Sequence, residues 1–72
     1  MEKDKRDFHF GLVSVQRKFL VPDQVIDALG IQFREYIHSE KHRRIGEILV
    51  DEGHMTQSQV AEVLEELEKE YP

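Results

Sequence analysis

Apolar residues recur every three or four positions along most of this chain, a spacing that predicts amphipathic α-helices. Pro22 and Gly53 interrupt the pattern, and so does the polar stretch 38–43. Proline suits the first position of a helix, and glycine suits the left-handed residue that follows a helix end. The sequence therefore predicts an all-α protein. Its four short helices are expected near residues 10–18, 22–38, 45–52 and 56–70.

Apolar positions within each predicted helix fall on one face, which we expect to be buried. Gly30 costs the second helix about 1 kcal/mol of helix propensity, and we interpret it as a point of close helix contact. Thr56 and Gln59 have the spacing of a capping box and mark the start of the last helix. The expected face of the second helix consists of Val25, Leu29, Gln32, Phe33 and Tyr36, with Ile26 and Ile37 beside it; those of the third and fourth are Ile45, Ile48 and Leu49, and Val60, Val63, Leu64 and Leu67.

The chain repeats itself at a constant offset of 35 positions. We interpret this as an internal duplication, with repeat one at about 9–32, a linker at 38–43 and repeat two at about 44–67. Each repeat is expected to form helix, turn, helix. Neither can bury its apolar face alone, so the two should pack as one small bundle and a single domain, 1–72. The identical matches are Gly11 with Gly46, Val15 with Val50, Gln24 with Gln59, Val25 with Val60, and Leu29 with Leu64.

Repeat two reads Arg-Ile-Gly at 44–46, Glu-Ile-Leu-Val at 47–50, Asp-Glu-Gly at 51–53 and Met-Thr at 55–56. Over residues 9–67 the chain resembles the N-terminal MshEN domain of type II secretion and type IV pilus assembly ATPases. Units of the type R-L-G-x-x-L-x-x-x-G come in tandem pairs in that family. The resemblance implies paired helical units. It also implies a ligand, because some members bind cyclic di-GMP through an arginine and the backbone near the glycines.

Repeat one departs from the family pattern at its ligand positions. His9 stands where the arginine belongs, and Lys18 stands where the second glycine belongs. Repeat two keeps Arg44 but has Leu67 in place of a glutamine. Half of a paired nucleotide site is therefore eroded. No GxxxxGK[ST] loop is present in the sequence, so this chain is not itself an ATPase motor.

Arg43 and Arg44 precede a predicted helix, where the helix dipole already carries partial positive charge. We favour ion pairing of these arginines with Glu47, Asp51 or the acidic last helix. The alternative is an anion site at the helix start, since free N–H groups, a close glycine and a guanidinium suit a phosphate. The ligand residues of that alternative are Arg43, Arg44, Gly46 and Gly53, helped by Lys18 or His9.

Composition narrows the function classes. The sequence has no cysteine, which excludes disulfides, thiolate metal sites and a cysteine nucleophile. A net charge of -5 argues against DNA or RNA as a partner. No apolar run is long enough to cross a bilayer, and the charged N-terminal segment does not resemble a signal peptide, so a cytoplasmic protein without membrane insertion is expected.

The side chains in this sequence do not support catalysis or metal binding. His38 and His42 share metal-ligand spacing, but no third ligand accompanies them, and we expect solvated linker histidines. Ser14 and Thr56 lack convincing triad partners, and the glutamates of the last helix read as a solvated face. We predict a protein that is not an enzyme and has no cofactor and no metal.

The remaining class is a binding module. We predict a small helical module that docks to a protein partner or to itself, and the alternative is a cyclic di-GMP sensor. The sensor requires an exposed Arg44 that faces His9 or Lys18, whereas docking requires a connected apolar surface. Apolar residues that exceed the needs of the two stripes are Phe8 and Tyr71 together with the predicted partner-binding residues Phe19, Val21, Tyr36 and Val50.

Overall fold

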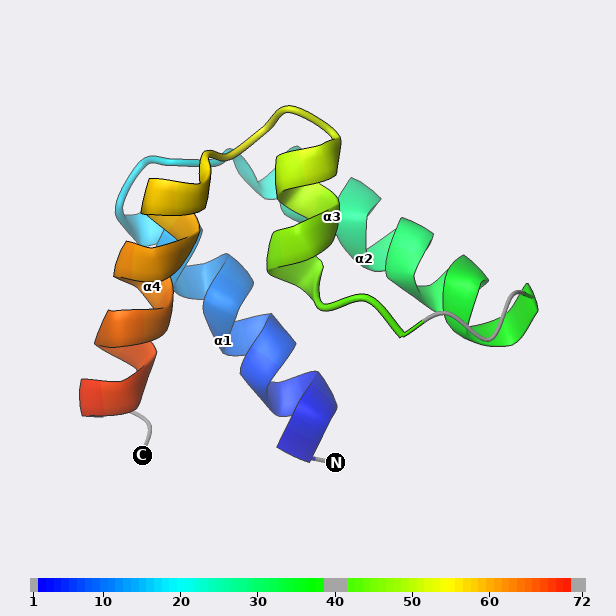
Figure 1. Ribbon diagram of the computed structural model, residues 1–72, viewed down its shortest axis with the longest axis horizontal. Coiled ribbons are helices and arrows are strands. Elements are labelled where there is room, and N and C mark those ends of the chain that lie inside the picture. Colours follow the sequence, from blue (N-terminus) through cyan, green and yellow to red (C-terminus); the bar gives the residue numbers. More distant parts are fainter. Residues whose placement is uncertain (1, 39–41, 71–72) are drawn as a thin grey trace.

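The computed structural model describes residues 2–38 and 42–70. Within those ranges it consists of four α-helices without any strand, which confirms the predicted small all-α bundle. Residues 39–41, in the predicted linker, and Tyr71 lie outside the described residues. The helices, in the order of the chain, are α1 (Glu2–Gln16), α2 (Pro22–His38), α3 (Ile45–Asp51) and α4 (Gln57–Glu70) (Figure 1).

Helix α1 begins much earlier than predicted. It starts at Glu2 rather than near residue 10. Residues 2–9 have little apolar periodicity, so their sequence gives no local helix signal. The helical segment instead carries Asp7, which is buried and bound by side chains of distant parts of the chain. The contacts of Asp7 with distant residues therefore accompany the early turns of α1, which the apolar pattern does not predict.

The most extensive helix contacts join the two repeats to each other. Helix α1 packs along α4, helix α2 packs against α3, and α1 and α3 meet at the centre (Figure 1). Exchange of the repeats maps α1 onto α3 and α4 onto α2, so it converts one of these pairs into the other. The main helix contacts between the repeats are thus preserved by this exchange.

The core lies where the four helices meet, and α3 supplies much of it. Ile45, Ile48 and Leu49 are almost completely buried, as the periodicity predicted. A helix of seven residues is unstable alone in water. Each buried aliphatic side chain contributes about 1.5–3 kcal/mol, so tertiary packing holds α3. The other buried apolar residues are Phe10, Val13, Leu20, Ala28, Met55, Val63 and Leu67.

Two glycines bring the helices within each repeat close together. A Cβ added at Gly11 would lie 2.6 Å from Cγ1 of Val25, and one added at Gly46 would lie 3.2 Å from Cγ1 of Val60. These pairs occupy matching positions of the two repeats. Gly30 behaves differently, because a Cβ there would meet only Nη2 of Arg34, at 3.4 Å. The prediction that Gly30 marks close helix contact within this chain is therefore wrong.

The turns of the two repeats have the same hydrogen bonds. Lys18 and Gly53 both adopt left-handed backbone, with φ of 65° and 78°. The N–H of Lys18 donates to the carbonyl of Val15 at 2.9 Å, and that of Gly53 donates to the carbonyl of Val50 at 3.0 Å. This is the Schellman arrangement that ends a helix. Lysine at this position bears a steric cost that glycine avoids.

The predicted capping box at the start of α4 is confirmed. The N–H of Gln59 donates to Oγ1 of Thr56 at 3.1 Å, and the N–H of Thr56 donates to Oε1 of Gln59 at 3.0 Å. In repeat one, the N–H of Val21 donates to Oε1 of Gln24, also at 3.0 Å. Val21 has no side-chain acceptor, so repeat one keeps only half of the motif.

No helix in the described part of the chain has both the length and the apolar character needed to cross a membrane.

Candidate functional site

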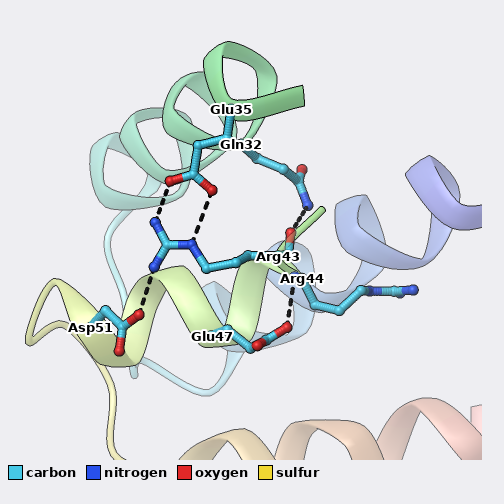
Figure 2. A network of polar contacts seen from close by, with 6 residues as sticks. All are labelled: Gln32, Glu35, Arg43, Arg44, Glu47 and Asp51. Carbon is cyan, nitrogen blue, oxygen red and sulfur yellow. Dashed lines mark hydrogen bonds and ion pairs between the residues drawn. The ribbon is translucent and has the colours of Figure 1, made fainter. Parts of the chain in front are cut away.

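Arg43 is held between two helices. Its Nε and Nη2 donate to the carboxylate of Glu35 on α2, with Nε 3.0 Å from Oε1, and its Nη1 donates to Oδ2 of Asp51 on α3 at 2.6 Å (Figure 2). The hydrogen bond to Glu35 raises the pKa of Arg43 above its already high usual value. The bidentate pair to Glu35 is the geometry that guanidinium and carboxylate prefer. The guanidinium is thus already occupied by protein carboxylates.

Arg44 pairs with a buried acid of α1. Its Nη2 lies 3.1 Å from Oδ1 of Asp7, and its Nε donates to the same oxygen at 3.2 Å. The Asp7 side chain is only 7% exposed, whereas that of Arg44 is 40% exposed. Figure 2 shows Arg44 extending from the start of α3 toward α1. The guanidinium therefore compensates a carboxylate that would otherwise be unpaired inside the protein.

Gln32 connects the same three helices. Its Nε2 donates to Oδ2 of Asp7 at 2.5 Å. The same atom donates to the backbone carbonyl of Arg43 at 3.1 Å (Figure 2). Gln32 lies on α2, Asp7 lies on α1, and Arg43 belongs to the segment that leads into α3. This polar cluster fixes the junction between the repeats, and the sequence did not identify Asp7 as a member.

The start of α3 has little room for an anion. Oε1 of Glu47 already accepts the N–H of Arg44 at 2.9 Å, so this carboxylate caps the helix (Figure 2). Together with Glu35, Asp51 and Asp7, it places four carboxylates around two guanidiniums. The net negative charge of these groups repels a phosphate. The favoured expectation of ion pairing is confirmed for Asp51, which pairs with Arg43. The acidic last helix pairs with Arg17 instead, whose Nε lies 2.6 Å from Oε1 of Glu66.

The structure does not gather the predicted nucleotide-binding residues. Gly46 is buried against Phe10 and Val60, so its backbone does not face solvent. Arg44 precedes α3 and Gly53 follows it, a separation of about 10 Å along a helix of this length. The turn after α1, which contains Lys18, and the turn after α3, which contains Gly53, lie at one end of the bundle, away from the start of α3 (Figure 1). His9 is half-buried on α1, with its ring edge-on to that of Phe8.

A second candidate site is the outer face of α2, which we define as Ile26, Gly30, Phe33 and Ile37. Phe33 is 65% exposed, Ile26 63% and Ile37 55%, and Tyr36 beside them is 65% exposed. The assignment of Phe33 and Tyr36 to the buried stripe of this helix is therefore wrong, and Ile26 and Ile37, predicted beside that stripe, are exposed as well. Ala28, on the opposite side of α2, is the residue that is buried. The helix thus has one apolar face in the core and a second one in water.

The predicted partner-binding residues divide into two groups. Tyr36 and Val21 are well exposed, at 65% and 57%. Phe19 and Val50 are half-buried and pack against the core. Only Tyr36 lies beside the outer face of α2, since Val21 precedes the helix. A smaller exposed pair, Phe8 and Leu12, lies one turn apart on α1.

Repeat two provides an internal reference for the outer face of α2. The 35-position offset carries Ile26, Gly30 and Phe33 onto Ala61, Glu65 and Glu68 of α4, all of which are exposed. Glu65 there forms an exposed ion pair with Lys69. The same helix position in the same fold therefore tolerates a polar surface. The contrast between Ile26 and Phe33 in repeat one and alanine and glutamate in repeat two is thus a signal in the sequence itself that singles out the outer face of α2.

The described residues hold no obvious metal centre. Within 6–38 and 42–70, no three histidine, aspartate or glutamate side chains lie close enough together to bind a metal ion. His42 instead stacks edge-on against Tyr36, with ring centroids 5.1 Å apart. His54 lies at the other end of the bundle, with Nδ1 3.3 Å from Nε2 of Gln24.

Comparison of the chain with protein-family models, curated proteins and solved structures found no match. The resemblance to the N-terminal domains of secretion and pilus ATPases therefore stays a prediction.

Proposed function

We propose that this protein is a non-enzymatic docking module that binds a protein partner through the outer face of α2. The observation that carries the proposal is the contrast between two matching helices. Helix α2 exposes Ile26 and Phe33 where α4 exposes Ala61 and Glu68. Connected apolar surface of this kind is costly to keep in water and marks interaction sites.

The size of the domain supports the same proposal. A chain of 72 residues has a single small core, and such domains commonly gain stability from a partner surface. The outer face of α2 makes no contribution to that core. Its aromatic and β-branched side chains would be protected from water only by a second molecule.

The polar cluster around Arg43 and Arg44 supports docking over nucleotide sensing. Each guanidinium already has a carboxylate partner from another helix. A cyclic dinucleotide would have to displace Asp7, which would then be buried without its cation. That exchange would cost about 1–3 kcal/mol before any new contact formed.

Photo-cross-linking tests the proposal. A photoreactive phenylalanine analogue is placed at position 33 on α2 in one variant and at position 68 on α4 in a matched control. We expect illumination in intact cells to yield discrete covalent products for position 33 and none for position 68, because only the former lies in a docking face. Absence of products at position 33, or equal products at both positions, would contradict the proposal.

A further inference from the structure

The outer face of α2 has the residue spacing of a two-helix seam. Ile26, Gly30, Phe33 and Ile37 are separated by four, three and four positions. This is the alternation with which one helix packs along another in coiled coils. Helix α2 has 17 residues and is therefore about 25 Å long, so the seam occupies most of it. The geometry thus suits a single helix as the occupant.

This seam is complementary to itself when one copy is reversed. Reversal about the midpoint between residues 31 and 32 places Ile26 of one copy against Ile37 of the other. It also places Phe33 of one copy over Gly30 of the other. Only the flexible end of Arg34 lies near the position of a Cβ at Gly30, at 3.4 Å. Gly30 therefore leaves a gap into which an aromatic ring fits, which gives this glycine a role that the isolated chain does not explain.

The charges beside the seam also match an antiparallel pair. Four exposed residues lie along one flank of the seam: Asp23, Asp27, Arg34 and His38. The acidic residues are in the first half of α2, and the basic residues are in the second half. An antiparallel pair brings Asp27 of each copy toward Arg34 of the other, whereas a parallel pair keeps the two charged flanks on opposite sides of the seam. Reversed helix dipoles act in the same direction.

We propose that the partner is a second copy of this chain, docked antiparallel through the outer face of α2 about a two-fold axis near residues 31 and 32. This inference rests on the docking function proposed above and assigns its partner. One helix buries less than the roughly 800 Å² per partner of a standard interface. The dimer therefore has a dissociation constant on the order of micromolar rather than nanomolar.

Sedimentation velocity of the purified chain over a concentration series tests the dimer. We expect reversible dimers that form in the micromolar range. Phe33→Glu, which copies the residue of α4, weakens dimerisation at least ~10-fold, as does Ile26→Glu. Glu68→Ala on α4 is the matched control and leaves it unchanged. Circular dichroism of each variant checks that it is folded. A chain that stays monomeric at about 1 mM, or a dimer that folded Phe33→Glu and Ile26→Glu leave intact, overturns the inference.

Charge exchange tests the antiparallel arrangement. Asp27→Arg alone and Arg34→Asp alone each weaken the dimer, and the double variant restores it, because the exchanged charges face each other again. A parallel pair would be indifferent to either single change, since its charged flanks lie on opposite sides of the seam. Single variants without effect, or a double variant that stays weak, overturn the antiparallel assignment.

The cross-linking experiment separates this inference from the proposed function. If position 33 captures a second copy, both stand. If it captures a different protein while the purified chain remains monomeric, the docking function stands and self-association is wrong. If it captures nothing and the chain is monomeric, both are wrong.

Discussion

Helices α2 and α4 occupy matching places in the two repeats, and their inward positions serve the same purpose. Val25 and Val60 receive the glycines of the preceding helices, and Ala28 and Val63 are buried in the core. Their outward positions differ, since α2 carries an apolar seam where α4 carries alanine and glutamate. Packing in the core therefore constrains the inward residues of both helices. Their outward residues make no core contacts and can differ without a change of fold.

The junction between the repeats breaks the symmetry in another way. The offset carries Phe8 and His9 onto Arg43 and Arg44, so only the second repeat has the arginine pair. These arginines bind Glu35 of α2 and Asp7 of α1, the two helices that contain most of the first repeat. The pair thus acts as a connector between the repeats rather than as half of a symmetric ligand site.

The largest change in the free energy of unfolding is expected when substitutions on the two faces of α2 are compared. Ala28→Glu places a carboxylate at a position that is 2% exposed, and we expect it to cost more than about 3 kcal/mol and to unfold the domain. Phe33→Glu on the opposite side should leave the monomer within about 1 kcal/mol of the original. Urea unfolding monitored by circular dichroism measures both. Equal losses would contradict the division into a core face and an outer face.

The junction should show the next largest effect. Arg44→Ala removes the cation that compensates Asp7, and we expect a loss of about 1–3 kcal/mol in the free energy of unfolding. Asp7 keeps Gln32 as a donor, which limits the loss. His9→Ala, at the matching position of repeat one, serves as the control and should cost less than Arg44→Ala. Thermal unfolding of the two variants checks the order, and a reversed order would contradict the connector role.

The turns should respond in opposite directions to an exchange of residues. Lys18→Gly relieves a side chain from left-handed backbone and should stabilise the domain by up to about 1 kcal/mol. Gly53→Lys introduces the same strain into repeat two and should destabilise it by about 1 kcal/mol. Denaturant unfolding of the two single variants measures the signs. Stabilisation by Gly53→Lys would show that the two turns are not equivalent.

The smallest effect is expected from the nucleotide. Because Arg43 and Arg44 are already paired and Gly46 is buried, cyclic di-GMP should cause no saturable shifts in an NMR titration of the labelled chain. GMP serves as the control ligand. Saturable shifts at Arg44, Gly46 and Gly53 that Arg44→Ala abolishes would restore the sensor interpretation and show that the ion pairs open.

The sequence predicted the elements that carry local signals. Pro22, Gly53 and the pair Thr56 and Gln59 mark helix ends through short-range steric and hydrogen-bonding effects, which do not depend on the rest of the fold. The start of α1 was missed because its anchor, Asp7, binds Arg44 from 37 positions away. The pairing of Arg43 with Glu35 was missed for a similar reason, since it joins α2 to the segment that leads into α3.

The outer face of α2 was misassigned for a different physical reason. Apolar periodicity identifies residues that share a helix face, but it does not identify which face meets the core. Ile26, Phe33 and Ile37 form as good a stripe as the buried side does. Only the position of α3 against the other side of α2, together with the polar counterpart on α4, distinguishes the two.

An NMR dilution series of the ¹⁵N-labelled chain tests the contrast between α2 and α4 most directly. We expect amide signals of α2 between Ile26 and Ile37 to shift with concentration, while those of α4 between Ala61 and Glu68 stay fixed. The shifts should vanish in Phe33→Glu. Shifts of equal size on α4, or an α2 that does not respond to concentration, would contradict the account.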